Sequence, residues 1–368
     1  MQKREPSDIL IPADYKQEFC QTLRVWFEKN KRDLPWRDTN DPYRIWISEI
    51  ILQQTRVAQG FDYYVRFIGR FPDVLSLADA EEDEVLKYWQ GLGYYSRARN
   101  LHQAAMTIKN QFAGQFPVAH KEVLSLKGVG DYTAAAICSF AYGAPYAVVD
   151  GNVYRFLSRL LGIDEPIDSV SGKNYFASLA QQLLDLESPA LHNQAIMEMG
   201  ALQCVAASPC CTQCPFANRC FAYYHSTVDQ LPVKIHKTKT RARYFAYFFL
   251  SKGDALYIQK RTGKDVWKNL YELPLVETET PVDEAFLADC EPVMKWLEGR
   301  VLPAPLFQIK HVLSHQVIHA SFYELELSGD VSVEGAREIH KAELENYPVS
   351  RLIHLFLEHC HPELLDLP

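Results

Sequence analysis

The sequence lacks the features that mark membrane, secreted and repeat proteins. No apolar run reaches the roughly 18 residues that a membrane-spanning helix needs. The N-terminal stretch MQKREPSDIL has no apolar core of the kind found in signal peptides. Tandem repeats and low-complexity segments are also missing. We therefore expect an intracellular, globular protein that does not enter a membrane.

A basic excess is missing too. The chain has 38 Lys and Arg against 46 Asp and Glu, for a formal net charge of −8, whereas nucleic-acid-binding domains are usually basic. The distribution of charge matters more than its sum. Basic residues cluster after residue 230, in a segment that is either a solvated linker or part of a basic surface: Lys234, Lys237, Lys239, Arg241 and Arg243.

The length of 368 residues favours two domains. Residues 15 to about 225 carry apolar residues at helical spacing, interrupted by short breaks rich in Pro, Gly and Asp. Strand-like patterns then follow at 244–251, 255–261, 270–276 and 317–327, with helical stretches after 281 and at 349–356. We predict an all-α domain over 1–230, a basic linker over 231–243 and an α+β domain over 244–368.

Five of the nine cysteines lie between residues 204 and 220. A disulfide framework is unusual in a large intracellular chain, so the cluster indicates a metal site. Thiolates select zinc or iron–sulfur. Zinc sites commonly use two CxxC pairs, and only Cys211 and Cys214 form one here, which favours iron–sulfur without excluding zinc. Cys210 is expected to be a bystander beside four ligands: Cys204, Cys211, Cys214 and Cys220.

A glycine-rich turn, Gly128-Val129-Gly130, lies between two helical patterns. Glycine permits positive φ and close backbone approach, and the free N–H groups at the start of the second helix can bind a phosphate. Glycine is also common in helix hairpins of any function. Further along, Asp150 precedes a helix, where it is either a helix cap or a functional carboxylate.

Glu49 lies inside an apolar helical segment, 44–58. A buried carboxylate is costly unless it is paired or neutral. Burial raises the pKa of a carboxyl group, which suits a general acid. The alternative is a structural Glu49 that pairs with Arg56 or another base.

The order of motifs resembles the MutY family of adenine DNA glycosylases, within the helix-hairpin-helix, endonuclease III superfamily. The matching strings are LPWR, SE, LQQT, LGYYSRARNLH, GVGDYTAAAI, VDGNV, HNQAIMEMGALQC and the cysteine loop, over about residues 18–224. The resemblance implies a [4Fe–4S] cluster and a cytoplasmic, nucleoid-associated monomer. It also implies base excision repair of double-stranded DNA, by hydrolysis of the bond to adenine mispaired with 8-oxoguanine or guanine.

The resemblance also implies roles for individual residues. Glu49 would protonate adenine N7, and an ionised Asp150, oriented by Asn152, would stabilise the sugar cation. Tyr132 matches a family tyrosine that assists this stage. Bifunctional relatives carry a lysine nucleophile at its position, so a monofunctional enzyme is expected. Arg37 and Gln194 would line the adenine pocket. Tyr94 would be the wedge that enters the base stack, and Gln54 would probe the opposite strand. The turn of Gly128, Val129 and Gly130 would contact a phosphate.

The C-terminal strings KDVWKNLYELP and HVLSH resemble the MutT-like domain of the same family, a Nudix relative by fold. No Nudix box lies between residues 274 and 300, so pyrophosphatase activity is not expected. In the family this domain reads 8-oxoguanine with a Phe-Ser-His loop, and the corresponding residues here are Leu313, Ser314 and His315. The leucine can still wedge but cannot stack, which leaves the strength of the 8-oxoguanine preference open.

Three alternatives remain at this point. The chain could be another helix-hairpin-helix glycosylase, acting on thymine mismatches or oxidised pyrimidines. It could also be a cluster-bearing DNA-binding protein without catalysis. A Nudix hydrolase is disfavoured by the missing box.

Overall fold

The computed structural model describes residues 11–236, 240–329 and 331–365. Within these residues the contacts form two compact units. Unit 1 is drawn from Met1–Tyr64, Ile68–Ala78 and Gln103–Lys237, and unit 2 from Val65–Phe67, Asp79–His102 and Thr238–Pro368. In the part of the chain that the structure describes, no helix is long and apolar enough to cross a membrane.

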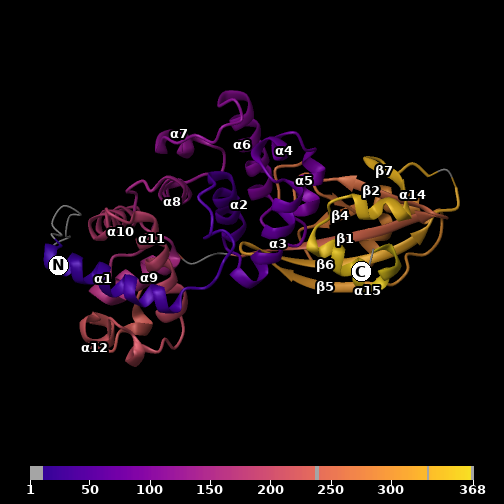
Figure 1. Cartoon of the computed structure of the whole chain (residues 1–368). Coiled ribbons are helices and arrows are strands. Elements are labelled where there is room, and N and C mark those ends of the chain that lie inside the picture. The colour runs from indigo at the N-terminus through magenta and orange to yellow at the C-terminus, as the bar shows by residue number, and fades with distance from the viewer. Residues whose placement is uncertain (1–10, 237–239, 330, 366–368) are drawn as a thin grey trace. The chain divides into compact units, whose positions relative to one another are not determined.

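Unit 1 is built from helices, as the spacing of apolar residues predicts (Figure 1). Its main helices are α1 (Ala13–Asn30), α2 (Pro42–Leu52), α3 (Val57–Arg70), α4 (Val74–Ala78), the C-terminal part of α6 (Ser96–Gln111), α7 (His120–Ser125), α8 (Asp131–Tyr142), α9 (Gly151–Leu161), α10 (Val170–Leu183), α11 (Pro189–Glu198) and α12 (Phe221–Tyr224). Left-handed glycines end α8 and α9, at Gly143 (φ 65°) and Gly162 (φ 68°). Aromatic rings join α1, α9 and the cysteine loop in one core. The ring centre of Phe216, in the loop, lies 5.4 Å from that of Phe19 on α1 and 5.3 Å from that of Phe156 on α9.

The helical segment predicted over 44–58 is interrupted. Helix α2 ends at Leu52 and α3 begins at Val57. The apolar run gives way there to polar residues, and Gln54 takes a left-handed backbone with φ 57°, which breaks the helix. Gln53 is fixed by a 3.3 Å hydrogen bond from its Nε2 to Thr133 Oγ1 on α8.

Unit 2 contains a seven-stranded sheet in the order β3-β2-β1-β6-β5, with β4 paired to β1 and β7 to β2. The strands are β1 (Arg241–Lys252), β2 (Ala255–Lys260), β3 (Tyr271–Glu272), β4 (Leu275–Thr278), β5 (Phe307–Val312), β6 (Gln316–Glu326) and β7 (Ala336–His340). The long β1 and β6 pair in parallel, and the other neighbours are antiparallel. Two of these strands, β5 and β7, are additional to the predicted pattern.

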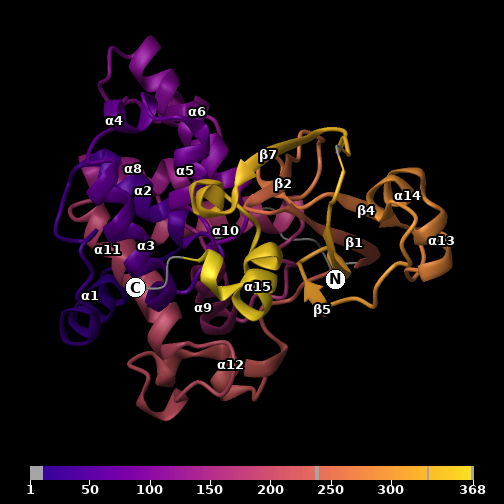
Figure 2. The ribbon, with the colours of Figure 1, turned by 90° about the vertical axis from the view of Figure 1, so that its right-hand side faces the viewer.

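Helices cover both faces of this sheet, because alternate residues of β1 point to opposite sides (Figure 2). On one face Phe248 packs 5.1 Å from Trp296 of α14 (Glu291–Leu297), which follows α13 (Glu284–Asp289). On the other, Phe249 packs 6.0 Å from Phe356 of α15 (Arg351–Cys360). Unit 2 also includes α5 (Glu82–Tyr88) and the start of α6.

The described residues of the segment expected to be a linker, 231–243, pack on the two units. Residues 231–236 lie on unit 1, where Asp168 accepts hydrogen bonds from the backbone N–H groups of Ile235 and His236. At the other end β1 begins at Arg241, and the buried Arg243 pairs with Asp265 and Glu277. The last three residues of the expected linker therefore belong to the sheet. Residues 237–239, with Lys237 and Lys239 of the basic cluster, lie outside the described residues.

Candidate active site

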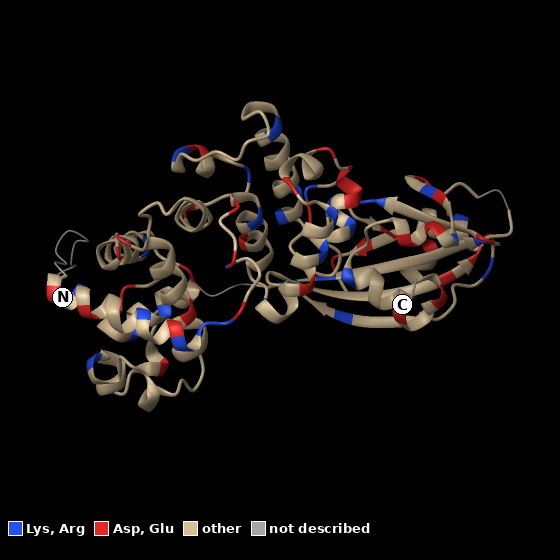
Figure 3. Cartoon of the chain, in the orientation of Figure 1, with Lys and Arg blue, Asp and Glu red and all other residues tan. Residues whose placement is uncertain are grey.

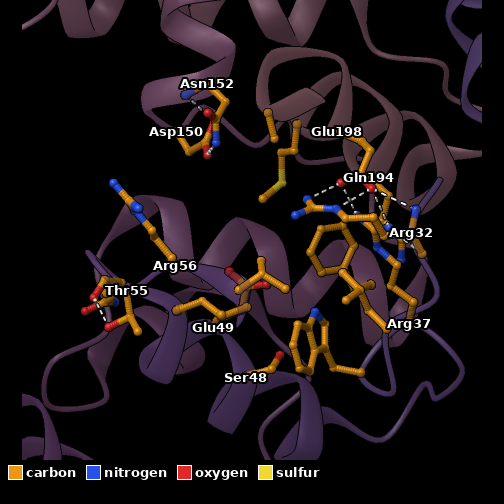
Figure 4. Close-up of a pocket in the computed structure, with 18 of the residues that line it drawn as sticks. Arg32, Arg37, Ser48, Glu49, Thr55, Arg56, Asp150, Asn152, Gln194 and Glu198 are labelled. Carbon is orange, nitrogen blue, oxygen red and sulfur yellow. Dashed lines mark hydrogen bonds and ion pairs between the residues drawn. The ribbon is translucent and has the colours of Figure 1, made fainter. Parts of the chain in front are cut away.

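A pocket of about 750 Å³ in unit 1 brings together side chains from α2, α8, α9 and α11. Seven residues predicted from the sequence line it: Arg37, Glu49, Gln54, Tyr132, Asp150, Asn152 and Gln194. Figure 4 shows Asp150 and Asn152 on one side of the pocket and Glu49 on the opposite side. Two carboxyl groups therefore face a shared space that is large enough for a nucleobase and its sugar.

Glu49 is buried on α2 and is 7% exposed. Burial raises its pKa to about 7, against the hydrogen bond from Tyr132, which favours the charged form. That bond runs from the Tyr132 hydroxyl to Glu49 Oε2 over 2.7 Å. Among the described residues no ion pair joins Glu49 to Arg56, the structural alternative considered above. Glu49 can therefore be protonated near neutral pH.

Asp150 is both a helix cap and a pocket residue. It is the N-cap of α9, and its Oδ1 accepts hydrogen bonds from the backbone N–H groups of Asn152 (2.9 Å) and Val153 (2.8 Å). Its Oδ2 accepts a third from Asn152 Nδ2 at 2.7 Å. Burial raises the pKa of Asp150, and these three bonds oppose the rise because they favour the carboxylate. The cap therefore serves the site rather than competing with it.

Arg155 connects this cap to the start of the cysteine loop. Its Nη2 donates to Asn152 Oδ1 at 2.8 Å and to the Gly200 carbonyl, and its Nε donates to the Cys204 carbonyl at 2.7 Å. Gly200 lies in a single π-turn, Met199–Gln203, that continues α11. Substituting this glycine is sterically costly, because an added Cβ would lie 2.5 Å from the Asn152 carbonyl oxygen. The carboxylate side of the pocket thus rests directly on the segment that leads into the cysteines.

Sequence reasoning missed Glu198 and Arg32, which line the same pocket. Glu198 is 1% exposed, and its Oε2 lies 2.7 Å from Arg37 Nη2 and 2.5 Å from Arg32 Nη2. Burial alone would raise the pKa of Glu198, but the hydrogen bonds from Arg32 and Arg37 outweigh burial and lower it to about 2. One signal was present in the sequence: Glu198 follows Gln194 by four residues, so the two share a face of α11.

The four predicted cysteine ligands line one cavity: Cys204, Cys211, Cys214 and Cys220. Cys210 is exposed and does not line it, as expected for a bystander. Arg159, buried beside the cavity, points its Nη1 at Cys204 Sγ over 3.6 Å and at the Val205 carbonyl over 2.7 Å. In the described part of the chain, no three His, Cys, Asp or Glu side chains are grouped closely enough for a single metal ion.

The glycine turn forms a hairpin between α7 and α8. Gly128 has φ 79°, which needs a glycine, and both Gly128 and Gly130 are exposed. Gly130 is the N-cap of α8, and no described side chain caps this helix end, so its first N–H groups can face a ligand. Val129, the third residue expected to contact a phosphate, is buried, and its N–H donates to the Leu126 carbonyl at 3.1 Å. Its N–H is therefore already used within the turn.

The other predicted contact residues lie on exposed turns of unit 2. Tyr94 lies between α5 and α6 with φ 49° and is 45% exposed. Leu313, Ser314 and His315 form the tip of the hairpin between β5 and β6, with Ser314 and His315 exposed. The hydroxyl groups of Tyr94 and Ser314 are in direct contact. Lys and Arg are interleaved with Asp and Glu in both units (Figure 3).

Both halves of the chain match known families. Residues 47–176 match the HhH-GPD superfamily of base excision DNA repair proteins, and residues 246–359 match the NUDIX domain. The adenine DNA glycosylase of Buchnera aphidicola subsp. Baizongia pistaciae is 31% identical over 312 residues, which cover 83% of this chain and 84% of that protein. The human adenine DNA glycosylase is 38% identical over 248 residues, covering 62% of this chain and 45% of that protein.

Solved structures resemble the helical part. A thermostable thymine-DNA glycosylase is 28% identical, with a TM-score of 0.52 over 57% of this chain and 97% of that one. Endonuclease III in a non-covalent complex with DNA matches with a TM-score of 0.51 at 20% identity, over 59% of this chain and 99% of that one. The second likeness supports the fold alone.

Proposed function

This chain belongs to the adenine DNA glycosylase family, and we propose that it acts by acid-catalysed hydrolysis, without strand cleavage, on adenine mispaired with 8-oxoguanine or guanine. It is a DNA N-glycosylase of base excision repair. The observation that carries the proposal is the unequal pair of carboxyl groups in the pocket. Glu49 has a pKa near 7, whereas Asp150 accepts three hydrogen bonds that favour its charged form.

The two carboxyl groups divide the reaction between them. Protonated Glu49 donates its proton to adenine N7, so that the base leaves as a neutral molecule when the bond to C1′ breaks. The positive charge that develops on the sugar is stabilised by the carboxylate of Asp150, held in place by Asn152. A water molecule then adds to C1′ and loses a proton to the Glu49 carboxylate, which restores the protonated acid and leaves an abasic sugar.

Adenine recognition is assigned to the polar end of the pocket. Adenine presents an exocyclic amine that donates and ring nitrogens that accept. Gln194 carries both a donor and an acceptor, Glu198 is a buried acceptor, and Arg37 supplies N–H donors. The buried pair of Glu198 and Arg37 is fixed before the base arrives, so little ordering remains to be done on binding.

Tyr132 accounts for the absence of strand cleavage. A lyase of this superfamily needs an amine nucleophile that forms a Schiff base with the sugar. The group that faces the pocket here is a phenol, and burial raises its pKa well above the ordinary value. It therefore stays neutral and donates its hydrogen bond to Glu49.

The four cysteines around one cavity fit a [4Fe–4S] cluster. Their shared cavity is lined by four thiols and by no described His, Asp or Glu side chain, and thiolates are the donors of such clusters. When bound, the cluster supplies a cross-link between four points of the loop and a redox-active group. Arg159 would remain beside the cluster, with its Nη1 directed at the Cys204 sulfur over 3.6 Å.

Contacts with double-stranded DNA are assigned to the exposed turns. Gly128 and Gly130 would approach a phosphate, Tyr94 would enter the base stack and Gln54 would probe the opposite strand. Gln54 and Tyr94 both have positive φ, a strained backbone that often occurs at functional sites. In 8-oxoguanine N7 carries a hydrogen, so that its N–H would donate a hydrogen bond to the exposed Ser314 hydroxyl. Leu313 would supply an apolar wedge. We expect a monomer that acts in the cytoplasm, at the nucleoid.

A single-turnover assay on labelled duplexes tests this function. The substrates carry adenine opposite 8-oxoguanine, adenine opposite guanine, or thymine opposite guanine. We expect breaks at the adenine only after alkali treatment, with 8-oxoguanine the faster partner. Strand breaks without alkali would contradict the monofunctional assignment. Excision of thymine rather than adenine would place the chain with the thymine-mismatch enzymes.

A further inference from the structure

The turn that carries Tyr94 is conformationally demanding. Between α5 and α6 the chain takes positive φ at Gly91 (90°), Gly93 (78°) and Tyr94 (49°). The two glycines adopt this conformation freely, but a tyrosine does so only at a cost of about 1 kcal/mol or more. Such a conformation persists only where the surroundings fix it, so some neighbour must hold Tyr94 in place.

One such neighbour is the Ser314 hydroxyl, which contacts the Tyr94 hydroxyl, and the other is Arg97, in the first turn of α6. Its Nη2 donates to the Gly93 carbonyl at 3.1 Å, and its backbone N–H donates to the Tyr94 carbonyl at 2.8 Å. The guanidinium carbon lies 5.6 Å from the centre of the Tyr94 ring and 5.3 Å from that of Trp89. Trp89 is buried and donates from Nε1 to the same Gly93 carbonyl at 3.1 Å.

The contacts make Arg97 the centre of a rigid support. One planar guanidinium packs against the buried Trp89 and the exposed Tyr94 and bonds the carbonyl between them. Burial lowers the pKa of Arg97 to about 10, so the group stays charged at neutral pH and can hold both rings by cation–π attraction. Lysine could keep the charge but lacks the planar fork that makes these contacts at once.

We infer that Arg97 is a positioning residue that holds the Tyr94 ring ready to enter the base stack, and so contributes to base flipping without touching DNA. The inference rests on the proposed role of Tyr94 as the wedge. Unstacking a base costs free energy. A wedge side chain offsets more of that cost when it is already fixed before DNA binds, because no conformational entropy is then lost on binding. Without Arg97 the turn can relax toward negative φ, and the ring no longer stands at the position that the stack requires.

Arg99 offers a matched control two residues away on the same helix. Its guanidinium donates to the Lys268 carbonyl at 2.7 Å, within unit 2, and is partly buried. Arg99→Ala therefore removes the same charge from the same helix without removing a support of Tyr94. A general electrostatic or folding effect would lower activity in both variants.

The test measures single-turnover adenine excision by Arg97→Ala, Arg97→Lys, Arg99→Ala, Tyr94→Ala and the Tyr94→Ala/Arg97→Ala double variant. Two duplexes are used. In one, adenine is paired opposite guanine; in the other it lies opposite an abasic-site analogue and has no pairing partner, so that less energy is needed to flip it. On the paired duplex we expect a loss of roughly tenfold to hundredfold for Arg97→Ala, a partial loss for Arg97→Lys, and no further loss in the double variant than in Tyr94→Ala. On the abasic duplex the defect of Arg97→Ala should shrink to about threefold or less.

The outcomes separate the inference from its premise. If Tyr94→Ala is slow and Arg97→Ala matches the wild type, the positioning role is overturned while the wedge stands. If Arg97→Ala is equally slow on both duplexes, Arg97 is structural only, and the inference is also overturned. If neither variant is impaired on the paired duplex, the wedge role of Tyr94 falls, and the inference falls with it.

Discussion

Replacing Tyr132 with phenylalanine should move the pH dependence of adenine excision to higher pH. The Tyr132 hydroxyl donates to Glu49 Oε2 at 2.7 Å and lowers the pKa of that carboxyl, against the larger effect of burial. A hydrogen bond to a charged group is worth about 1.5–3 kcal/mol. Since each pKa unit corresponds to about 1.36 kcal/mol, its loss should raise the pKa of Glu49 by about one to two units.

The sign of the shift follows from the role of Glu49 as an acid. The active form is protonated, so the rate of the wild type should fall above pH 7, tenfold for each further unit. In Tyr132→Phe the fall should begin about one unit higher or more, even if the maximal rate is reduced by the loss of the phenol.

The assay is single-turnover excision at enzyme concentrations below saturation, because that rate reports the pKa of the free enzyme. Tyr43→Phe provides a matched control. Tyr43 is another buried tyrosine, on the same helix as Glu49, and its hydroxyl donates to the Phe71 carbonyl at 2.7 Å. Its removal should leave the alkaline limb in place. An alkaline limb that stays put or moves to lower pH in Tyr132→Phe would refute the reasoning.

Three further substitutions, two of them with a matched control variant, test separate parts of the account. Glu49→Gln should stabilise the fold by roughly 3 kcal/mol at pH 8.5 and by almost nothing at pH 4. Folding raises the pKa of Glu49 from 4.5 to about 7, so the wild-type carboxyl destabilises the protein as pH rises through that window. Urea unfolding at both pH values measures the difference. Glu198→Gln should cost about 3 kcal/mol at pH 7, since it removes the buried carboxylate that pairs with the partly buried Arg32 and Arg37. Its control, Glu28→Gln, breaks an exposed pair and should change stability by less than about 1 kcal/mol. Cys211→Ser should abolish bound iron and visible absorption, and Cys210→Ser should retain both.

Periodicity and motif order predicted most of what positions the site. The helical spacing predicted across residues 15 to about 225 includes α8, which carries Tyr132, and α9, which Asp150 caps. The strand β5 was readable in principle, since its residues alternate between partly buried and exposed, but six residues are a short signal. The edge strand β7 has Ile339 as its one buried residue, so alternation could not reveal it.

The missing parts depend on contacts between distant residues. Glu198 and Arg32 are 166 positions apart, and nothing local in either segment shows that they meet. The positive φ of Gln54 and Tyr94 is equally hidden, because both residue types usually occupy other conformations. The grouping of Asp79–His102 with the C-terminal residues is a property of packing alone.

The central claim is that Glu49 gives its proton to the departing adenine, and the direct test is the single-turnover rate of Glu49→Gln on a duplex with adenine opposite 8-oxoguanine. A glutamine keeps the shape and polarity of the side chain but has no proton to give. The account predicts a rate lowered by at least about 100-fold, with duplex binding and bound iron unchanged. A variant that binds DNA and excises adenine within tenfold of the wild-type rate would contradict it.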